Sequence, residues 1–229
     1  GYTPPAIKLS SDVMTPEVLW SFGRIGNVSV SPDGSKAVYD ITYFNKEEDR
    51  GYSDLYLMNL PEGQTTRLTD TDYNESDAGW TPDGKFITYL AKGQLWEMNP
   101  DGSNPRQVTD IPDGINGYVY APDMSKIVYL KDVQLEPTVQ DLYPDLPKAK
   151  ARIVDDQFYR HWNDWVDAYT HLFIADYVPA QPITTGKDIM EGERWESPVR
   201  PWGGVEQLAW TKDGKKLIYT CRKKIGIDL

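Results

Sequence analysis

The two histidines are the first candidates for chemistry, because an imidazole can bind a metal ion or move a proton near neutral pH. His161 and His171 lie ten residues apart, and Asp155, Asp156 and Asp164 are close to them in the sequence. Their spacing is not one that is typical of a zinc site. We therefore expect no metal ion and no cofactor. We expect His171 to open a β-strand and His161 to make hydrogen bonds.

A loop rich in glutamate is the second candidate. Glu191, Glu193 and Glu196 surround Arg194 and Trp195. Paired carboxylates can hold a desolvated ammonium group through charge-assisted hydrogen bonds. A solvated surface loop is the simpler interpretation, and we favour it. Glu193 and Glu196 are nevertheless kept as candidate substrate-binding residues.

An aromatic segment is the third candidate. Phe158, Tyr159, Trp162 and Trp165 occur within eight positions, together with Arg160. Such side chains either form a recognition surface or pack the segment onto the rest of the protein, since aromatic residues dominate buried contacts. We favour packing, and keep Arg160, Trp162 and Trp165 as candidate substrate-binding residues. The acidic patches at 47–49 and 70–72 lack the spacing of a calcium loop, so we expect them to be solvated.

No complete catalytic set is visible. A serine hydrolase needs a nucleophile, a base and an oxyanion site in one pocket, and the sequence contains no Gly-x-Ser-x-Gly motif. Cys221 is the only cysteine, which excludes a disulfide within the chain and a cysteine-based metal site. We therefore expect no catalytic residues in this chain.

The charge balance limits the partners. With 24 basic and 35 acidic residues, the formal net charge is −11, which disfavours nucleic acid and anionic membranes as partners. No apolar run approaches the ~18 residues of a membrane span, and no segment has the pattern of a signal peptide. The first residue is Gly1 and not Met, which suggests a processed or engineered start.

The elements that must position these residues are marked by one short turn that occurs four times. Proline presets the second position of a type I turn, aspartate tolerates the third, and glycine accepts a positive φ at the exit. Apolar, β-prone runs flank each copy, which predicts hairpins. The four copies read Ser31-Pro32-Asp33-Gly34, Thr81-Pro82-Asp83-Gly84, Ala121-Pro122-Asp123-Met124 and Thr211-Lys212-Asp213-Gly214.

The first two copies belong to repeats of four strands. Residues 94–99 match 54–59 position for position, and 106–109 match 67–69. The turn aspartates are 50 and then 40 residues apart, which are the periods of a four-stranded propeller blade. The segment before the first repeat is predicted to hold one helical turn from Thr15-Pro16 through Trp20.

The third repeat is interrupted. Its second strand, 127–130, is followed by a partner at 171–176 only some forty residues later, and 183–185 is predicted to end the repeat. Residues 131–168 are therefore an insertion, although a whole hidden blade within 131–185 is the rival interpretation. Within the insertion, 148–157 is the segment most typical of a helix. Residues 158–165 either continue that helix or form a strand against 170–176.

The two long connections are expected to emerge on the same side of the propeller. Successive connections between antiparallel strands alternate between its two faces, and the Pro-Asp-Gly turns occupy one of them. The insertion 131–168 and the connection 186–204 both fall on the other face by this alternation. Long loops on a rigid scaffold are where function concentrates.

The fourth repeat stops after two strands, which predicts that the chain is a fragment with open strand edges. The expected fold is all-β: a partial β-propeller of four-stranded antiparallel blades, about three and a half in number, with one mostly helical or hairpin insertion. Its expected divisions are an N-terminal segment at 1–20 and blades at 21–70, 71–110, 111–185 with the insertion 131–168, and 205–229. We also expect copies to associate as homo-oligomers through the open edges.

The sequence resembles the N-terminal β-propeller of bacterial serine peptidases of the prolyl oligopeptidase family, in the dipeptidyl peptidase and acylaminoacyl peptidase branch. The Pro-Asp-Gly turns are shared with many propellers, whereas the stretches at 159–173 and 201–224 are more specific. The matching residues are Ser-Pro-Asp-Gly (31–34), Tyr-Arg-His-Trp (159–162), Asp164-Trp165, His171-Leu172-Phe173, Pro201-Trp202-Gly203-Gly204, Trp210, Asp213-Gly214-Lys215, Tyr219 and Arg222-Lys223-Lys224.

This resemblance implies a partner and a function. In the family, the propeller covers a C-terminal α/β-hydrolase domain that carries a Ser-Asp-His triad, and no such domain is expected within these residues. The chain would then be a non-catalytic, substrate-gating domain of a secreted exopeptidase, periplasmic or extracellular, which releases dipeptides or acylated amino acids from short peptides. Related dipeptidyl peptidases hold the substrate's amino group with an adjacent Glu-Glu motif, which is not present here. The alternative is a stand-alone propeller scaffold that binds a protein or glycan partner.

Overall fold

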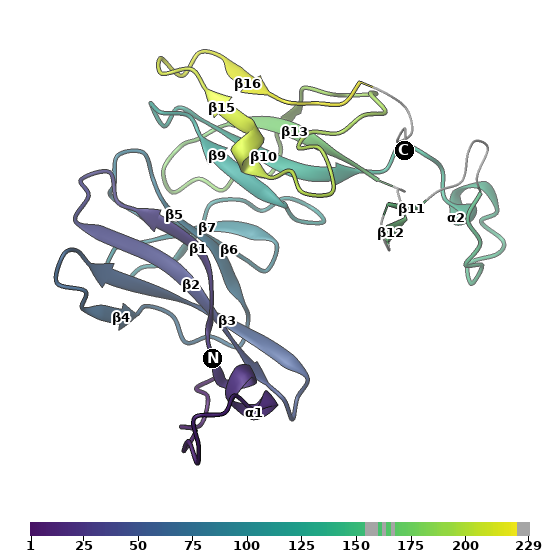
Figure 1. Ribbon diagram of the computed structural model, residues 1–229. Helices are drawn as coiled ribbons and strands as arrows, with labels where there is room; N and C mark the ends of the chain where they lie inside the picture. Colours follow the sequence, from purple (N-terminus) through teal and green to yellow (C-terminus); the bar gives the residue numbers. More distant parts are fainter. Residues whose placement is uncertain (154–159, 162–163, 166–167, 224–229) are drawn as a thin grey trace. The chain divides into compact units, whose positions relative to one another are not determined.

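The structure is a computed structural model, and it describes residues 1–153, 160–161, 164–165 and 168–223. Two compact units account for the chain. The first comprises Gly1–Gly114 with Tyr177–Thr185, and the second comprises Ile115–Asp176 with Gly186–Leu229. Figure 1 labels most of the strands of both units. Every strand pair within the sheets is antiparallel.

The first unit contains two four-stranded sheets, each with its strands in chain order. The helix α1 (Pro16–Ser21) precedes them. The first sheet consists of β1 (Arg24–Val30), β2 (Lys36–Asn45), β3 (Arg50–Asn59) and β4 (Thr65–Arg67), and the second of β5 (Glu75–Trp80), β6 (Ile87–Ala91), β7 (Gln94–Met98) and β8 (Arg106–Gln107).

The second unit contains one four-stranded sheet, of order β14-β13-β10-β9, and a two-stranded sheet, β15-β16. These strands are β9 (Gly117–Tyr120), β10 (Lys126–Val133), β13 (Tyr169–Asp176), β14 (Lys187–Asp188), β15 (Leu208–Trp210) and β16 (Leu217–Tyr219), with the 3-10 helix η1 (Val205–Gln207) before β15. The predicted fold class, a partial β-propeller, is confirmed.

In all four turns the aspartate carboxylate accepts the backbone N–H two residues later, and in three of them it also accepts the hydroxyl of the first turn residue. In the first turn, the Asp33 carboxylate accepts from the Ser31 hydroxyl at 2.6 Å and from the Ser35 N–H at 3.0 Å. These hydrogen bonds lower the pKa of Asp33 to about 2. Asp83 and Asp213 accept a threonine hydroxyl in the same way, at 2.7 and 2.6 Å. The aspartate therefore holds each turn together through the hydrogen bonds that its carboxylate accepts.

The third turn is the exception, and it supports a stability prediction. Met124 holds φ +58°, where the other three turns have glycine, and a side chain in this left-handed region costs about 1–2 kcal/mol. Met124→Gly should therefore raise the free energy of unfolding by ~0.5–1 kcal/mol, after the greater entropy of glycine in the unfolded chain is subtracted. Urea titration of the chain measures the change.

Gly34 provides the matched control for that prediction. It has φ +73°, and an added Cβ would meet no atom within 4 Å. Gly34→Ala should therefore lower the stability through backbone strain alone. If Met124→Gly lowers the stability, the strain at Met124 is smaller than the entropy that glycine adds to the unfolded chain, and the prediction is wrong.

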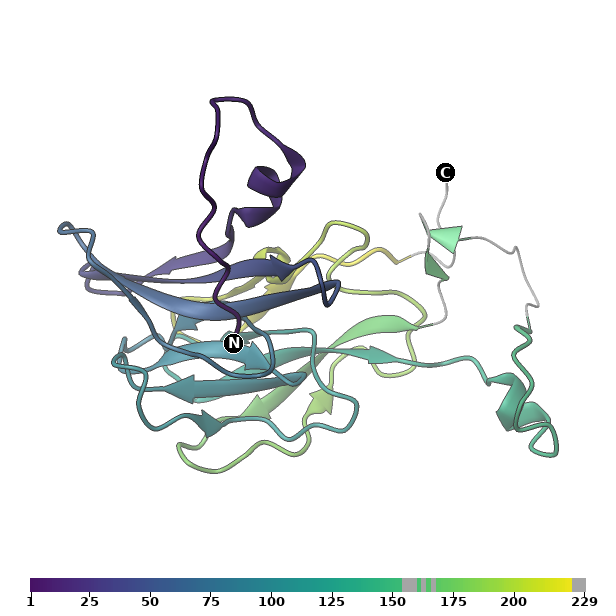
Figure 2. The same ribbon diagram turned by 90° about the horizontal axis from the view of Figure 1, so that it is seen from below.

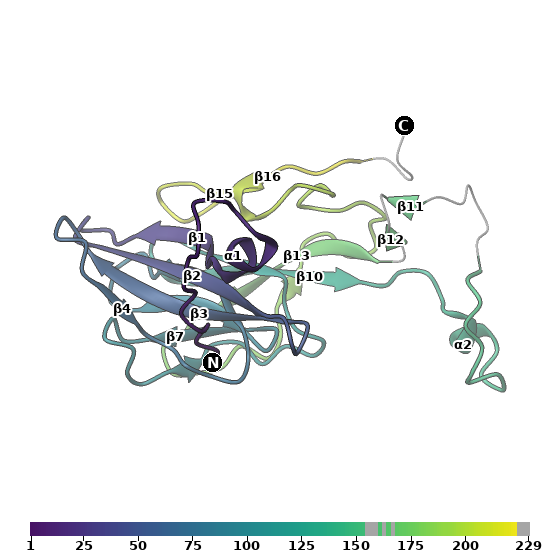
Figure 3. The same ribbon diagram turned by 60° about the horizontal axis from the view of Figure 1, so that its bottom comes forward.

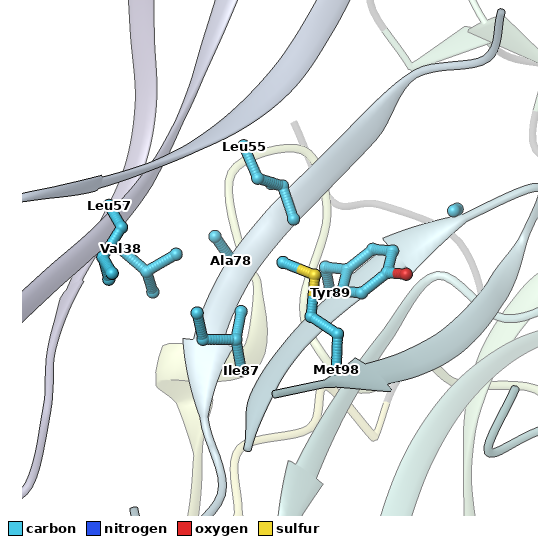
Figure 4. Packing of buried hydrophobic residues seen from close by; sticks show 8 residues of the cluster. Val38, Leu55, Leu57, Ala78, Ile87, Tyr89 and Met98 are labelled. Atoms are coloured by element: carbon cyan, nitrogen blue, oxygen red, sulfur yellow. The ribbon is translucent and has the colours of Figure 1, made fainter. Parts of the chain in front are cut away.

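The core of the first unit lies between its two sheets (Figure 4). Val38, Leu55 and Leu57 of the first sheet pack against Ala78 and Ile87 of the second, and all five side chains are buried. Side chains on the opposite face of β1, including Val28 and Val30, are exposed. Their cross-strand partners on β2, Tyr39 and Ala37, are buried, so this exposure is at the β1 edge of the sheet. The predicted association of copies through open edges stays a prediction.

A tryptophan at the end of the first strand joins neighbouring sheets in both units. The Trp80 indole N–H donates to the Ser29 carbonyl at 3.2 Å, and the Trp210 indole N–H donates to the Val119 carbonyl at 3.4 Å. Ser29 and Val119 each lie two residues before their own turn motif. The sheet β15-β16 thus packs on β9 in the way that β5 packs on β1, as successive blades do.

The N-terminal helix is confirmed. The Thr15 hydroxyl caps α1 by accepting the Val18 N–H at 3.3 Å, and proline occupies the first turn. Trp20 meets the Phe44 ring of β2 edge-on, with centroids 5.3 Å apart. Figure 2 shows α1 and the segment before it on the outside of the first sheet.

The predicted helix at 148–157 is wrong over the described residues 148–153, which have no regular secondary structure. These residues are almost all exposed, and a short helix without an apolar face to bury is marginal in water. Within the part of the insertion that the structure describes, the helix is α2 (Val139–Leu142), which a Thr138–Asp141 capping box begins. Residues 154–157 lie outside the described residues.

Two strand assignments also change. The last strand of the third sheet is β14, not 183–185; Ile183 instead forms a parallel bridge with Thr109 in the first unit. In the insertion, β11 (Arg160–His161) and β12 (Asp164–Trp165) pair with each other as a hairpin and not with 170–176. Figure 3 shows α2 and this hairpin beyond the ends of β10 and β13.

Candidate functional site

Two long segments meet at one end of the third sheet. One is the insertion between β10 and β13, and the other is the segment 189–204, which we call the Glu193 loop. The Arg200 guanidinium donates to the Ala168 carbonyl at 2.6 Å, and an ion pair joins Arg194 to Glu136. The Glu136 charge raises the pKa of Arg194. The sequence prediction that these segments emerge on the same side of the sheet agrees with these contacts.

Glu196 is held by an arginine in its own loop. The Arg200 Nε lies 2.8 Å from Glu196 Oε2, and the Arg200 backbone N–H donates to Glu196 Oε1 at 3.1 Å. The Glu196 side chain is only 14% exposed. The Ser197 N–H then donates to the Thr170 carbonyl of β13 at 3.0 Å. The Glu196 side chain is thus mostly buried and paired with Arg200, and the next residue is bonded to the sheet.

Glu193 is positioned by its backbone. Its N–H donates to the Met190 carbonyl at 2.9 Å, and its carbonyl lies 3.0 Å from His171 Nε2. Among the residues that the structure describes, no cation pairs with the Glu193 carboxylate, whereas Glu136 and Glu196 each have an arginine. Glu193 therefore presents a half-buried carboxylate on a turn that is hydrogen-bonded through its backbone, and such a group can accept hydrogen bonds from an ammonium.

His171 was expected only to open a strand. It is the third residue of β13, and its side chain is fully buried. Its Nδ1 lies 2.8 Å from Asp188 Oδ2. The sequence offered no sign of this role, because Asp188 and Glu193 follow His171 by 17 and 22 residues.

The remaining predicted residues belong to the insertion. Trp162 lies outside the described residues. Arg160 pairs with Trp165 through the backbone of the hairpin. Trp165 is half-buried, with the Arg152 guanidinium 4.9 Å from its ring centroid. A substrate-binding role for Arg160, Trp162, Trp165, Glu193 and Glu196 stays a prediction.

Two further observations concern metal binding and membrane spanning. Over the described ranges, no cluster of three or more histidine, cysteine, aspartate or glutamate side chains is arranged to hold a metal ion. In the same part of the chain, none of the helices has the length and apolar character needed to span a bilayer.

Comparison with known proteins identifies relatives over nearly the whole chain. No family model matches it. Dipeptidyl-peptidase 5 of Porphyromonas endodontalis is 39% identical over 222 residues, which cover 95% of this chain and 32% of the relative. For dipeptidyl-peptidase 5 of Porphyromonas gingivalis the identity is 38% over 229 residues, 98% of this chain and 33% of the relative. The chain is a homologue of dipeptidyl-peptidase 5.

The chain spans about a third of the length of the curated relatives it matches. Among solved structures, the acylaminoacyl peptidase of Pyrococcus horikoshii superposes on 69% of the chain and 24% of its own, with a TM-score of 0.52 and 16% identity. At that identity the likeness establishes the fold alone. Together these relatives confirm the resemblance to a peptidase-associated propeller of the prolyl oligopeptidase family that the motifs at 159–173 and 201–224 predicted.

Proposed function

We propose that this chain is the substrate-gating propeller domain of a secreted serine exopeptidase. A hydrolase domain on the same, longer protein would supply the Ser-Asp-His triad, and the propeller would admit only short peptides. The products would be dipeptides or acylated amino acids, and the compartment would be periplasmic or extracellular. The homology to dipeptidyl-peptidase 5 over almost the whole chain supports the peptidase assignment.

The observation that carries the gating role is the Glu193 loop. Its backbone is fixed to β13, and its cationic side chains are engaged with Glu136 and Glu196. This arrangement leaves Glu193 as a positioned acceptor beside the insertion. A peptide with a free amino terminus offers an ammonium of the matching charge, and a rigid loop preserves the geometry that binding requires.

Glu193→Gln in the full-length protein tests this role. A hydrogen bond to a charged group contributes about 1.5–3 kcal/mol, and the half-exposed position of Glu193 favours the lower end. We therefore expect the KM for short peptides with a free amino terminus to rise about tenfold, with a small change in kcat. Hydrolysis of a small ester without an ammonium should be unchanged.

Glu62→Gln is the matched control, because Glu62 is an exposed glutamate in the β3–β4 turn of the other unit. It should leave both substrates unaffected. Unchanged peptide kinetics in Glu193→Gln would refute the role of Glu193. A variant in which peptide and ester hydrolysis fall together would point to damage to the fold instead.

A further inference from the structure

His171 is enclosed by two hydrogen-bond acceptors and is shielded from water. Asp188 Oδ2 lies 2.8 Å from Nδ1, and the Glu193 carbonyl lies 3.0 Å from Nε2. Asp188 comes from β14, the neighbour of β13, and Glu193 comes from the turn that follows β14. The His171 side chain therefore contacts the residues on both sides of this turn.

The number of protons that the two contacts require restricts the protonation state of the His171–Asp188 pair. A neutral imidazole carries one N–H, so it can donate to only one of the two oxygens. A carbonyl oxygen cannot donate, so Nε2 must carry a hydrogen for the contact with Glu193 to be a hydrogen bond. The remaining contact, between Nδ1 and Asp188, then requires a second proton, on either the ring or the carboxylate. Asp188 Oδ1 already accepts the Met190 N–H at 2.8 Å, which favours the carboxylate as an acceptor on both oxygens.

The charged and titratable groups around His171 come from β10, β14 and the Glu193 turn. Lys131 is the cross-strand partner of His171 on β10 and has a partner of its own. Tyr129 shares that face of the sheet, and the charge of Asp188 contributes to raising its pKa, after burial as the larger cause. β14 contributes Asp188, and the turn that follows it contributes the Glu193 carbonyl. Asp188 is thus the anion in direct contact with the ring.

We propose that His171 is a positioning residue: as an imidazolium bonded to Asp188, it holds the Glu193 turn closed, and loss of its proton releases that turn. Without the second proton, either the Glu193 carbonyl or the Asp188 carboxylate would face a nitrogen lone pair in a dry site, which is costly. The relevance of the turn to peptides rests on the proposed function. The proton-linked closure itself does not.

The variants of this pair separate the two contacts. In His171→Gln, the amide nitrogen replaces Nε2 and keeps the donor to Glu193. In His171→Asn, it replaces Nδ1 and keeps only the donor to Asp188. In Asp188→Asn, the new amide can donate to Nδ1, so a neutral ring suffices. The chain has only two histidines, so His161→Asn assigns the His171 ring signals in nitrogen-15 NMR spectra of the 229-residue chain.

The experiment follows the ring nitrogens and the hydrogen-exchange protection of the Glu193 N–H as pH rises. In the unmodified chain, both ring nitrogens should carry protons at low pH, and protection should fall about tenfold when the ring becomes neutral. His171→Gln and Asp188→Asn should keep the protection at all pH values. His171→Asn should lack it throughout.

Several results would overturn the closure. They are a neutral ring at every pH at which the chain is folded, an Asp188→Asn variant with the same pH dependence as the unmodified chain, or full protection in His171→Asn. These results are independent of peptide kinetics. If the closure holds while Glu193→Gln leaves KM unchanged, the proposed function fails and the closure stands.

Discussion

Replacing Glu97 by alanine should lower the free energy of unfolding by about 3–5 kcal/mol. The Glu97 side chain on β7 is fully buried. Its Oε2 accepts from the Arg106 Nε at 2.8 Å, and both of its oxygens accept from the Tyr177 hydroxyl, at 2.9 and 3.1 Å. Removal of this carboxylate leaves a guanidinium without its counter-charge and a phenol without its acceptor.

The environment of Tyr177 shows how strongly the group is desolvated. Burial, together with the charge of Glu97, raises the pKa of Tyr177 to about 12. The first repeat has Leu57 at the position that Glu97 holds in the second, which shows that an apolar residue fits this position when its neighbours are apolar. A double variant, Glu97→Leu with Arg106→Leu, should therefore regain part of the loss.

Urea unfolding of the single and double variants, followed by circular dichroism, measures these changes. A loss below about 1 kcal/mol for Glu97→Ala is the value expected of a solvated surface pair. Such a result would contradict the buried geometry described for Glu97.

Trp80→Ala is expected to have the next largest effect, a loss of about 3 kcal/mol. The Trp80 indole packs against the core between the first and second sheets, and its N–H donates to the Ser29 carbonyl. Truncation of a large aromatic side chain in such a position removes buried surface and leaves a cavity. The two sheets would lose a contact that the β1 and β5 backbones cannot replace.

Two controls separate the contributions of Trp80. Trp80→Phe keeps most of the ring but loses the donor, so it should cost about 1 kcal/mol. Trp202→Ala removes an indole that is 79% exposed and should change the stability by less than about 0.5 kcal/mol. Differential scanning calorimetry of the three variants measures how much stability each one loses. A loss of stability in Trp202→Ala as large as in Trp80→Ala would contradict this account.

The strands and turns were predictable because their signals are local. Three of the turns carry a hydroxyl, an aspartate and a glycine within four residues, the third turn in the chain keeps only the aspartate, and the strands that flank each turn are apolar and β-branched. The assignment of 183–185 as a strand failed for the opposite reason. The true last strand, β14, has only two residues, which is too short to show a period of alternation. Residues 183–185 are β-branched and therefore look like a strand in the sequence, but Ile183 forms a bridge with Thr109 instead.

The candidate site was predictable in composition but not in contacts. Glu193 and Glu196 were found because three glutamates surround one arginine. The arginines of the same loop have distant partners: Glu136 precedes Arg194 by 58 residues, and Ala168 precedes Arg200 by 32. His171 was missed because a buried histidine in a strand looks the same in sequence whether or not it holds a loop.

Residues 177–185 contact the second sheet but are synthesised well after its strands. Glu97 and Tyr177 are 80 residues apart, so at about 5–20 residues per second Tyr177 is synthesised roughly 4–16 s after Glu97. During that interval the second sheet has its strands but lacks both the phenol that bonds Glu97 and the backbone of Ile183, which bonds Val108 and Asp110. The second repeat is therefore completed by residues from the third. The rate of synthesis thus determines when the Glu97 carboxylate can acquire the hydrogen bonds from Tyr177.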